Sequence, residues 1–206
     1  MVSRVHAEGG PARALLEAAA RGDVASVGRS LAAGEKVDIR DAAGRTPLLL
    51  ATHGNHTETA KALITAGADV NAKDDIQDSP YLYAGAHGRT EILRLTLVAG
   101  ADLKSLNRYG GTALIPACHY GHVENVRLLL GTAIDIDHVN RLGWTALLEA
   151  VILGDGGPAH IEIVRLLLEA GANPSIADRE GVTPLDHARR RGFAQMVRLL
   201  ERREAR

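Results

Sequence analysis

The sequence predicts an all-α solenoid made of about six copies of one helix-turn-helix unit, each with a hairpin loop. Two markers recur in one register. A Thr or Ser followed by Pro or Ala begins at positions 46, 79, 112, 145 and 183, and Gly, or Ala in one copy, stands at 34, 67, 100, 133 and 171. Both series are spaced by 33, 33, 33 and 38 residues. A fixed period in the range of roughly 20–50 residues is typical of repeat architectures.

Composition agrees with thin, closely stacked helices. Hydrophobic residues make up 46% of the 206 residues, but aromatic residues only 3%, so the core must be built from Leu, Val, Ile and Ala. The formal net charge is -1, which gives no general attraction to nucleic acid or to a membrane. The charged fraction of 24% is that of an ordinary globular protein and argues against disorder.

Each unit has a physical explanation. The Thr or Ser hydroxyl is expected to cap a short first helix, such as Leu114–His119, and Pro is tolerated at the first helical position. A glycine such as Gly121 then allows a tight turn into a second helix. That helix carries apolar residues at helical spacing, as in Val123, Val126 and Leu129. A left-handed glycine ends it, and an extended stretch leads to a hairpin turn at a further glycine.

The sequence resembles the ankyrin repeat in three segments: GRTPLLLATHGNHTETAKALITAGADVNAKD, GGTALIPACHYGHVENVRLLL and GVTPLDHARRRGFAQMVRLLE. The resemblance covers residues 11–204. It implies an ankyrin-repeat α-solenoid forming a single domain over residues 1–206. The six expected repeats are 11–40, 41–73, 74–106, 107–139, 140–177 and 178–204.

Three departures from the repeat carry expectations. Ala133 stands where a left-handed Gly is expected, so we expect local strain there and a gain in stability from Ala133→Gly. Gln77 replaces the hairpin Gly of the third repeat, so that turn is expected to be distorted. The five extra residues of the fifth repeat, Asp155–Ala159, are expected to form a dispensable loop between its two helices.

The resemblance also implies how the chain functions, namely as a non-catalytic scaffold that binds a partner protein through a concave groove of repeats 3–5. Hairpin tips and exposed positions of the first helices would line the groove. Tyr109 and Trp144 are expected to be exposed and central to binding, because Trp, Tyr and Arg dominate interface energetics. Arg108 and Arg141 beside them are expected to pair with a partner's carboxylates. The full expected set is Ile76, Asp78, Tyr83, His87, Arg108, Tyr109, His119, Tyr120, Arg141, Trp144 and Ile152.

Not every residue of interest is expected to serve the groove. Tyr81 and Tyr83 stand close to core positions, where filling gaps between repeats is favoured over partner binding. His87 and His119, together with His53, could form a sensor for a small anion or metal ion, whereas His56, His122 and His160 match a structural position of the repeat. No nucleophile elbow, metalloprotease motif, phosphate loop or dinucleotide fingerprint is present, so no enzyme activity, cofactor or metal is expected. Cys118 is expected to be an unreactive buried residue.

Partner and compartment follow from the same reasoning. We expect a protein partner, no nucleic acid, no membrane, and a monomer or weak dimer. No run of about 18 apolar residues exists, and the N-terminal segment lacks the continuous apolar stretch of a signal peptide. The expected location is therefore the cytoplasm, or the bacterial periplasm if a leader has been removed.

Overall fold

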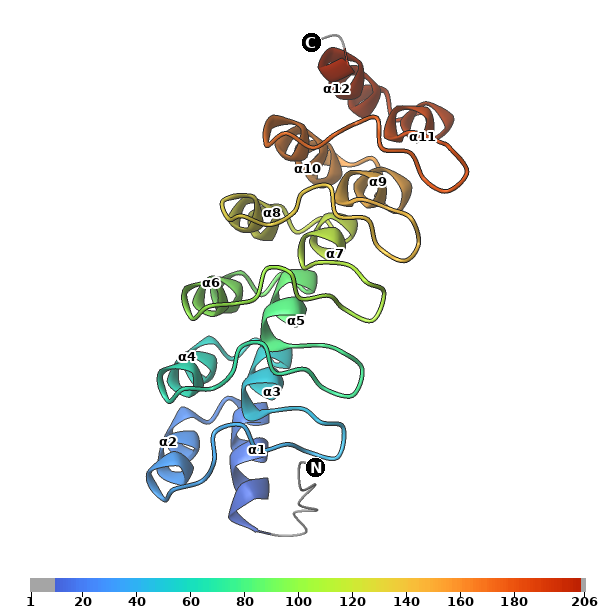
Figure 1. Ribbon diagram of the computed structural model, residues 1–206. Coiled ribbons are helices and arrows are strands. Elements are labelled where there is room, and N and C mark those ends of the chain that lie inside the picture. The colour runs from blue at the N-terminus through green and yellow to red at the C-terminus, as the bar shows by residue number, and fades with distance from the viewer. Residues whose placement is uncertain (1–9, 205–206) are drawn as a thin grey trace. The chain divides into compact units, whose positions relative to one another are not determined.

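The computed structural model describes residues 10–204, and twelve α-helices in six consecutive pairs account for most of them (Figure 1). No strand occurs in this range, which confirms the all-α solenoid. The pairs are α1 (Pro11–Arg21) and α2 (Val24–Ala32), α3 (Pro47–His53) and α4 (Thr57–Thr65), α5 (Pro80–Ala86) and α6 (Thr90–Val98), α7 (Leu114–His119) and α8 (Val123–Leu130), α9 (Ala146–Ile152) and α10 (Pro158–Glu169), and α11 (Pro184–Arg190) and α12 (Ala194–Glu204). The expectation about the signal peptide rests in part on residues 1–9, which lie outside the described range.

The helices fall into two compact units, which are described separately. Within the described residues, unit 1 contains 10–84 and 89–102, and unit 2 contains 85–88 and 103–204. In unit 1, α1 packs on α2 and α3, and α4 packs on α2, α3 and α6. In unit 2, the first helices α7, α9 and α11 form one layer and the second helices α8, α10 and α12 form another. The expectation of a single domain stays a prediction.

Hydroxyl caps begin the first helices at four of the five expected positions. Thr46, Thr145 and Thr183 accept a hydrogen bond from the backbone N–H three residues on, and the Ser79 hydroxyl does the same. At Thr112 the expected cap is absent, because the following helix α7 starts later, at Leu114. Pro116 explains the difference. It has no N–H to donate to the Thr112 carbonyl, a bond that the other four units make.

The predicted backbone strain at Ala133 was wrong. Within residues 10–204 only Asn55 and Gln77 have positive φ without being glycine. Helix α8 ends at Leu130, and the Thr132 hydroxyl then donates to the Leu129 carbonyl and accepts from the Ile134 N–H. This wider turn removes the need for a left-handed residue.

The strained position is instead Gln77, with φ of 69°. The equivalent hairpin glycines at 44, 110, 143 and 181 have φ between 73° and 87°. The Gln77 N–H donates to the Asp74 carbonyl over 3.1 Å, as each equivalent glycine does to its own turn. The turn is therefore not distorted, contrary to the prediction, and Gln77 adopts the conformation that glycine provides elsewhere.

The insertion in the fifth repeat is only partly a loop. Pro158 and Ala159 form the first turn of α10, which is longer than the other second helices of unit 2. Asp155 accepts a hydrogen bond from the Gly157 N–H and lies 2.9 Å from Nδ1 of His160. A methyl group at Gly156 would come within 2.5 Å of the Phe193 ring, so the loop packs against the sixth repeat.

Candidate functional site

The hairpin tips are built on a side chain that opens each turn. Its Oδ1 atom accepts hydrogen bonds from the backbone N–H groups two and four residues on. At Asn107 the donors are Tyr109 and Gly111, over 2.9 and 3.0 Å. The series comprises Asp41, Asp74, Asn107, Asn140 and Asp178. Its spacing of 33, 33, 33 and 38 residues was visible in the sequence, but the sequence analysis did not use it.

Successive tips of unit 2 are joined by hydrogen bonds. The Arg141 N–H donates to the Tyr109 carbonyl over 3.0 Å, and the Arg141 guanidinium donates to the Arg108 carbonyl over 3.1 Å. The Arg179 guanidinium donates in turn to the Arg141 carbonyl over 2.5 Å. The Arg108 guanidinium lies over the Tyr109 ring, 5.2 Å from its centroid. These bonds fix the tips as one ordered edge.

Large apolar side chains exposed on unit 2 include, besides Val139, residues at two kinds of position. At the tips these are Tyr109 and Leu142, 55% and 47% exposed. At the ends of the first helices they are Tyr120 and Leu153, 57% and 41% exposed. The predicted exposure of Tyr109 is confirmed. The sequence analysis left Leu142 and Leu153 out of its binding set, although both stood at free positions of the repeat.

The predicted exposure of Trp144 was wrong, because this residue is half-buried. Its role in partner binding stays a prediction. Tyr109 and Leu142 occupy the middle of their turns. Trp144 instead stands directly before Thr145, the buried residue that caps α9. Its N–H is also held by Asn140, over 3.1 Å. Trp144 is therefore partly covered by its surroundings, whereas Tyr109 projects from its turn.

Two aromatic rings stack at the end of the first helix of the fourth repeat. The centroids of the His119 and Tyr120 rings are 4.2 Å apart, and the two rings are nearly parallel. The centroid of the His87 ring lies 6.5 Å from that of Tyr120. Nδ1 of His119 is 3.7 Å from Oε2 of Glu149 on the next first helix. Three expected site residues of unit 2, His87, His119 and Tyr120, are thus brought together.

Glu149 is a buried carboxylate that the sequence analysis missed. Only 8% of its side chain is exposed, and its Oε1 atom accepts a hydrogen bond from Asn140 over 2.9 Å. Burial raises the pKa of Glu149 to about 7. Burial also lowers the pKa of His119, with a further contribution from the charge of His160. The equivalent residues of the earlier repeats are Leu50, Tyr83 and Pro116. The single acidic residue in this series was therefore the sequence signal that could have pointed to Glu149.

Two of the three histidines assigned a structural role, His56 and His160, make bonds between consecutive repeats. Nε2 of His56 lies 3.1 Å from the Ala20 carbonyl, and Nε2 of His160 lies 2.8 Å from the His119 carbonyl. In the part of the chain that the structure describes, no group of three or more His, Cys, Asp or Glu could hold a metal ion. The alternative of a metal sensor therefore gains no support from the described residues. That of a sensor for a small anion stays a prediction.

Cys118 is fully buried, as predicted, and burial raises the pKa of its thiol well above the usual value. The reactive form of cysteine is the thiolate. That Cys118 is unreactive therefore stays a prediction, which the burial of its thiol supports.

The remaining expected site residues differ in environment. Ile76 is 54% exposed, whereas Asp78 and Tyr83 are half-buried, and these three belong to unit 1. The Tyr83 ring lies 4.0 Å from that of His53. In unit 2, Ile152 is half-buried, and its carbonyl accepts a hydrogen bond from the Arg191 guanidinium over 2.8 Å.

Comparison with known proteins now identifies the family. Models of ankyrin repeats match residues 43–75, 81–178 and 158–201. An ankyrin repeat domain from Acinetobacter baumannii AYE is 56% identical, with a TM-score of 0.90, over 92% of this chain and 97% of that chain. This chain belongs to the ankyrin repeat family. The ankyrin repeat protein EF0377 is 49% identical, with a TM-score of 0.88, over 91% and 96% of the two chains.

Two further ankyrin relatives match at lower identity or over a shorter length. The ankyrin repeat domain of Bcl-3, of the IkappaB protein family, is 32% identical with a TM-score of 0.82, over 92% of this chain and 85% of that domain. The Escherichia coli (strain K12) protein named "Putative ankyrin repeat protein YahD" is 52% identical over 52 residues, which is 25% of this chain and 26% of that protein. The chain thus matches about a quarter of this curated relative.

The ankyrin family sets the general role. Ankyrin repeats are generally protein-interaction domains and typically non-catalytic. Among the described residues, no helix is both long enough and apolar enough to cross a membrane.

Proposed function

We propose that the protein is a non-catalytic scaffold whose unit 2 binds a partner protein through its tips and first-helix ends. We call this the binding face, defined by His87, Arg108, Tyr109, His119, Tyr120, Arg141, Leu142, Trp144, Ile152 and Leu153. Ile76, Asp78 and Tyr83 of unit 1 stay in the proposal as predicted contacts. The cytoplasm is the proposed location, and a monomer or weak dimer the proposed state.

The observation that carries the proposal is the exposure of Tyr109 and Tyr120. Both rings are more than half exposed, although aromatic residues are scarce in this chain. Aromatic residues are enriched where protein interfaces are fully buried. Neither ring is needed to fill the core, which is made of aliphatic residues such as Leu114, Leu129 and Leu147.

The experiment compares partner capture by Tyr109→Ala and Tyr120→Ala with capture by the unchanged protein in a lysate of the source organism. If these rings anchor the partner, each change should weaken binding by roughly 1–2 kcal/mol, measured by titration with the isolated partner. Stability should change by under about 0.5 kcal/mol, since both sites are at the surface.

Val98→Ala is the matched control. Val98 is 85% exposed, ends α6 and lies outside the binding face. Its removal should leave capture unchanged. Equal capture by the Tyr109, Tyr120 and Val98 variants would exclude the binding face as the interaction surface.

A further inference from the structure

The tips of unit 2 carry an exposed row of arginines that those of unit 1 lack. Arg108, Arg141 and Arg179 occupy the same position of consecutive tips, and all three are exposed. The equivalent residues of unit 1 are Ala42 and Asp75. The three arginines thus place positive charge along this edge of a chain whose formal net charge is only -1.

Each arginine is followed by a residue that differs from tip to tip. Tyr109 follows Arg108 and Leu142 follows Arg141, which places an exposed apolar side chain beside an exposed cation twice in succession. Glu180 follows Arg179 and is the one acidic residue among the central residues of these three turns. The edge is therefore both apolar and cationic.

The arginine side chains are held in place before any partner binds. Arg141 and Arg179 each donate one guanidinium hydrogen bond to the carbonyl of the preceding tip, and Arg108 stacks over Tyr109. A guanidinium has five N–H groups, so the single bond that Arg141 and Arg179 each make to the preceding tip leaves further N–H groups of these two side chains for a carboxylate. Ordering the side chain in advance reduces the entropy lost on binding.

We propose that the partner presents an acidic segment to this edge, with Asp or Glu residues next to apolar side chains. This inference rests on the proposed function and specifies the chemistry of the partner. Arginine forks match carboxylates in geometry and charge, and the apolar neighbours would cover Tyr109 and Leu142. Packed helices are spaced by about 8–10 Å, and an extended chain rises by about 3.3 Å per residue, so acids about three residues apart would meet successive tips.

The test uses a displayed library of random peptides selected against the unchanged protein, followed by Kd measurement on the enriched sequences. We expect Asp or Glu beside an aromatic or aliphatic residue. The triple change Arg108→Gln, Arg141→Gln and Arg179→Gln should weaken the best peptides at least tenfold. Their affinity for the unchanged protein should fall as salt is added, because exposed charge pairs are screened.

The matched control changes Arg198, Arg202 and Arg203 of α12 to Gln, which removes the same charge from three exposed positions elsewhere. It should change Kd by less than twofold. The triple change to Lys at 108, 141 and 179 keeps the charge but loses the guanidinium fork, so its affinity should lie between those of the unchanged protein and the triple Gln variant. Thermal melts check that each variant is folded.

Different failures separate the two proposals. Peptides that need Tyr109 but show no acidic preference, and bind the triple Gln variant equally well, would overturn the acidic partner and leave the binding face standing. If every selected peptide binds the Tyr109→Ala variant as tightly as the unchanged protein, the proposed function itself would be overturned. Tighter binding of a labelled thymidine 20-mer than of any peptide, lost in the triple Gln variant, would show that the edge serves nucleic acid.

Discussion

Gln77 and Glu149 show what a single residue costs when it departs from its repeat. Gln77 takes a left-handed backbone conformation that glycine takes at the equivalent hairpin positions. Glu149 places a carboxylate where earlier repeats have Leu50, Tyr83 and Pro116. The first departure strains the backbone and the second buries a titratable group. We therefore expect each departure to affect the stability of the folded protein.

We expect Gln77→Gly to stabilise the protein. A non-glycine residue in the left-handed region costs about 1–2 kcal/mol, and glycine costs about 0.5–1 kcal/mol in chain entropy. The Gln77 side chain is exposed, so little packing is lost. The net gain should be several tenths to about 1 kcal/mol by the same estimates, measured as a higher urea midpoint.

Ala133→Gly is the matched control for this measurement, because Ala133 is also exposed but does not have positive φ. It should lower the midpoint, since glycine then adds only entropy to the unfolded chain. A rise for Ala133→Gly, or a fall for Gln77→Gly, would contradict this account of the backbone.

We expect Glu149→Gln to make stability less dependent on pH. Burial raises the pKa of Glu149 from 4.5 to about 7, so the folded state binds this proton more tightly than the unfolded state. The contribution is fully present below pH 4.5 and is lost as pH rises through about 7. Gln keeps an acceptor for Asn140 without the charge.

The variant and the unchanged protein should therefore be similarly stable near pH 4.5. Above pH 8 the variant should be the more stable, by at most about 3 kcal/mol. Urea unfolding at several pH values measures the difference. A difference that stays constant with pH would mean that Glu149 titrates normally in the folded protein.

At the scale of elements, local sequence patterns predicted most of the helices. A few single residues altered where a helix begins or how it ends. The hydroxyl caps and the α7 bounds Leu114–His119 were predicted from the sequence. The missing cap at Thr112 also has a cause in the sequence, because Pro116 removes the bond that would start the helix earlier. The turn after α8 was harder to predict, since Thr132 offers hydrogen bonds that compete with a left-handed residue.

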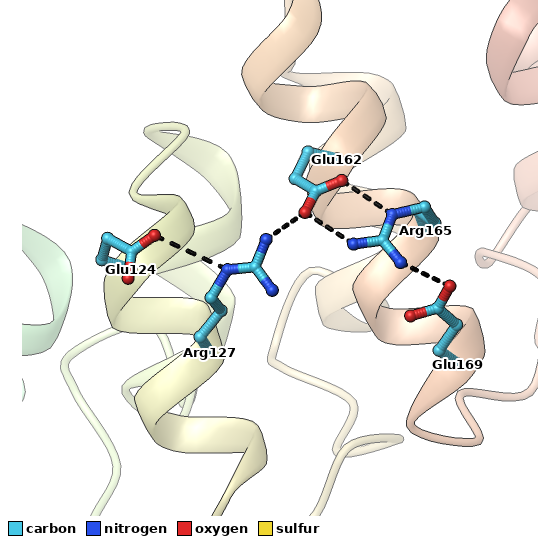
Figure 2. A network of polar contacts seen from close by, with 5 residues as sticks. All are labelled: Glu124, Arg127, Glu162, Arg165 and Glu169. Atoms are coloured by element: carbon cyan, nitrogen blue, oxygen red, sulfur yellow. Dashed lines mark hydrogen bonds and ion pairs between the residues drawn. The ribbon is translucent and has the colours of Figure 1, made fainter.

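An ion-pair network connects the outer helices α8 and α10 of unit 2 (Figure 2). Glu162 lies at its centre. It accepts hydrogen bonds from Arg165 over 2.6 and 2.7 Å and pairs with Arg127 of the neighbouring helix. Its hydrogen bond with Arg165 is the main cause of the lowered pKa of Glu162. The network therefore joins two repeats through one carboxylate.

We expect Glu162→Gln to destabilise the protein by roughly 0.5–1 kcal/mol, in the upper part of the range for exposed ion pairs, because one change breaks two pairs. The loss should shrink in high salt and as pH falls below 4.5, where the unfolded carboxylate is protonated. Glu124→Gln is the matched control, since Glu124 only pairs with Arg127 at 3.5 Å within its own helix. Equal losses for the two variants would show that the link between helices adds nothing.

At the scale of the whole molecule, the repeat period predicted the fold, and exposure at the tips predicted part of the candidate site. Tyr109 was predicted because its place in the turn leaves its ring outside the core. The half-burial of Trp144 and the approach of Glu149 to His119 depend on how neighbouring helices are rotated against each other. A pattern of residue types along one repeat does not specify that rotation.

The expectation of a single domain predicts that the chain unfolds in one transition. Trp144 is the one tryptophan and reports on unit 2, whereas far-UV circular dichroism reports on all the helices. The division between the units runs through α5, because Ala84 belongs to unit 1 and Gly85 to unit 2. Unfolding either unit alone would therefore break the helix pair of the third repeat, and one repeat cannot bury its apolar surface alone.

Urea curves from fluorescence and circular dichroism should coincide, as a two-state transition requires. Midpoints more than about 0.5 M apart, beyond the usual error of such fits, would show that the two units unfold as separate domains.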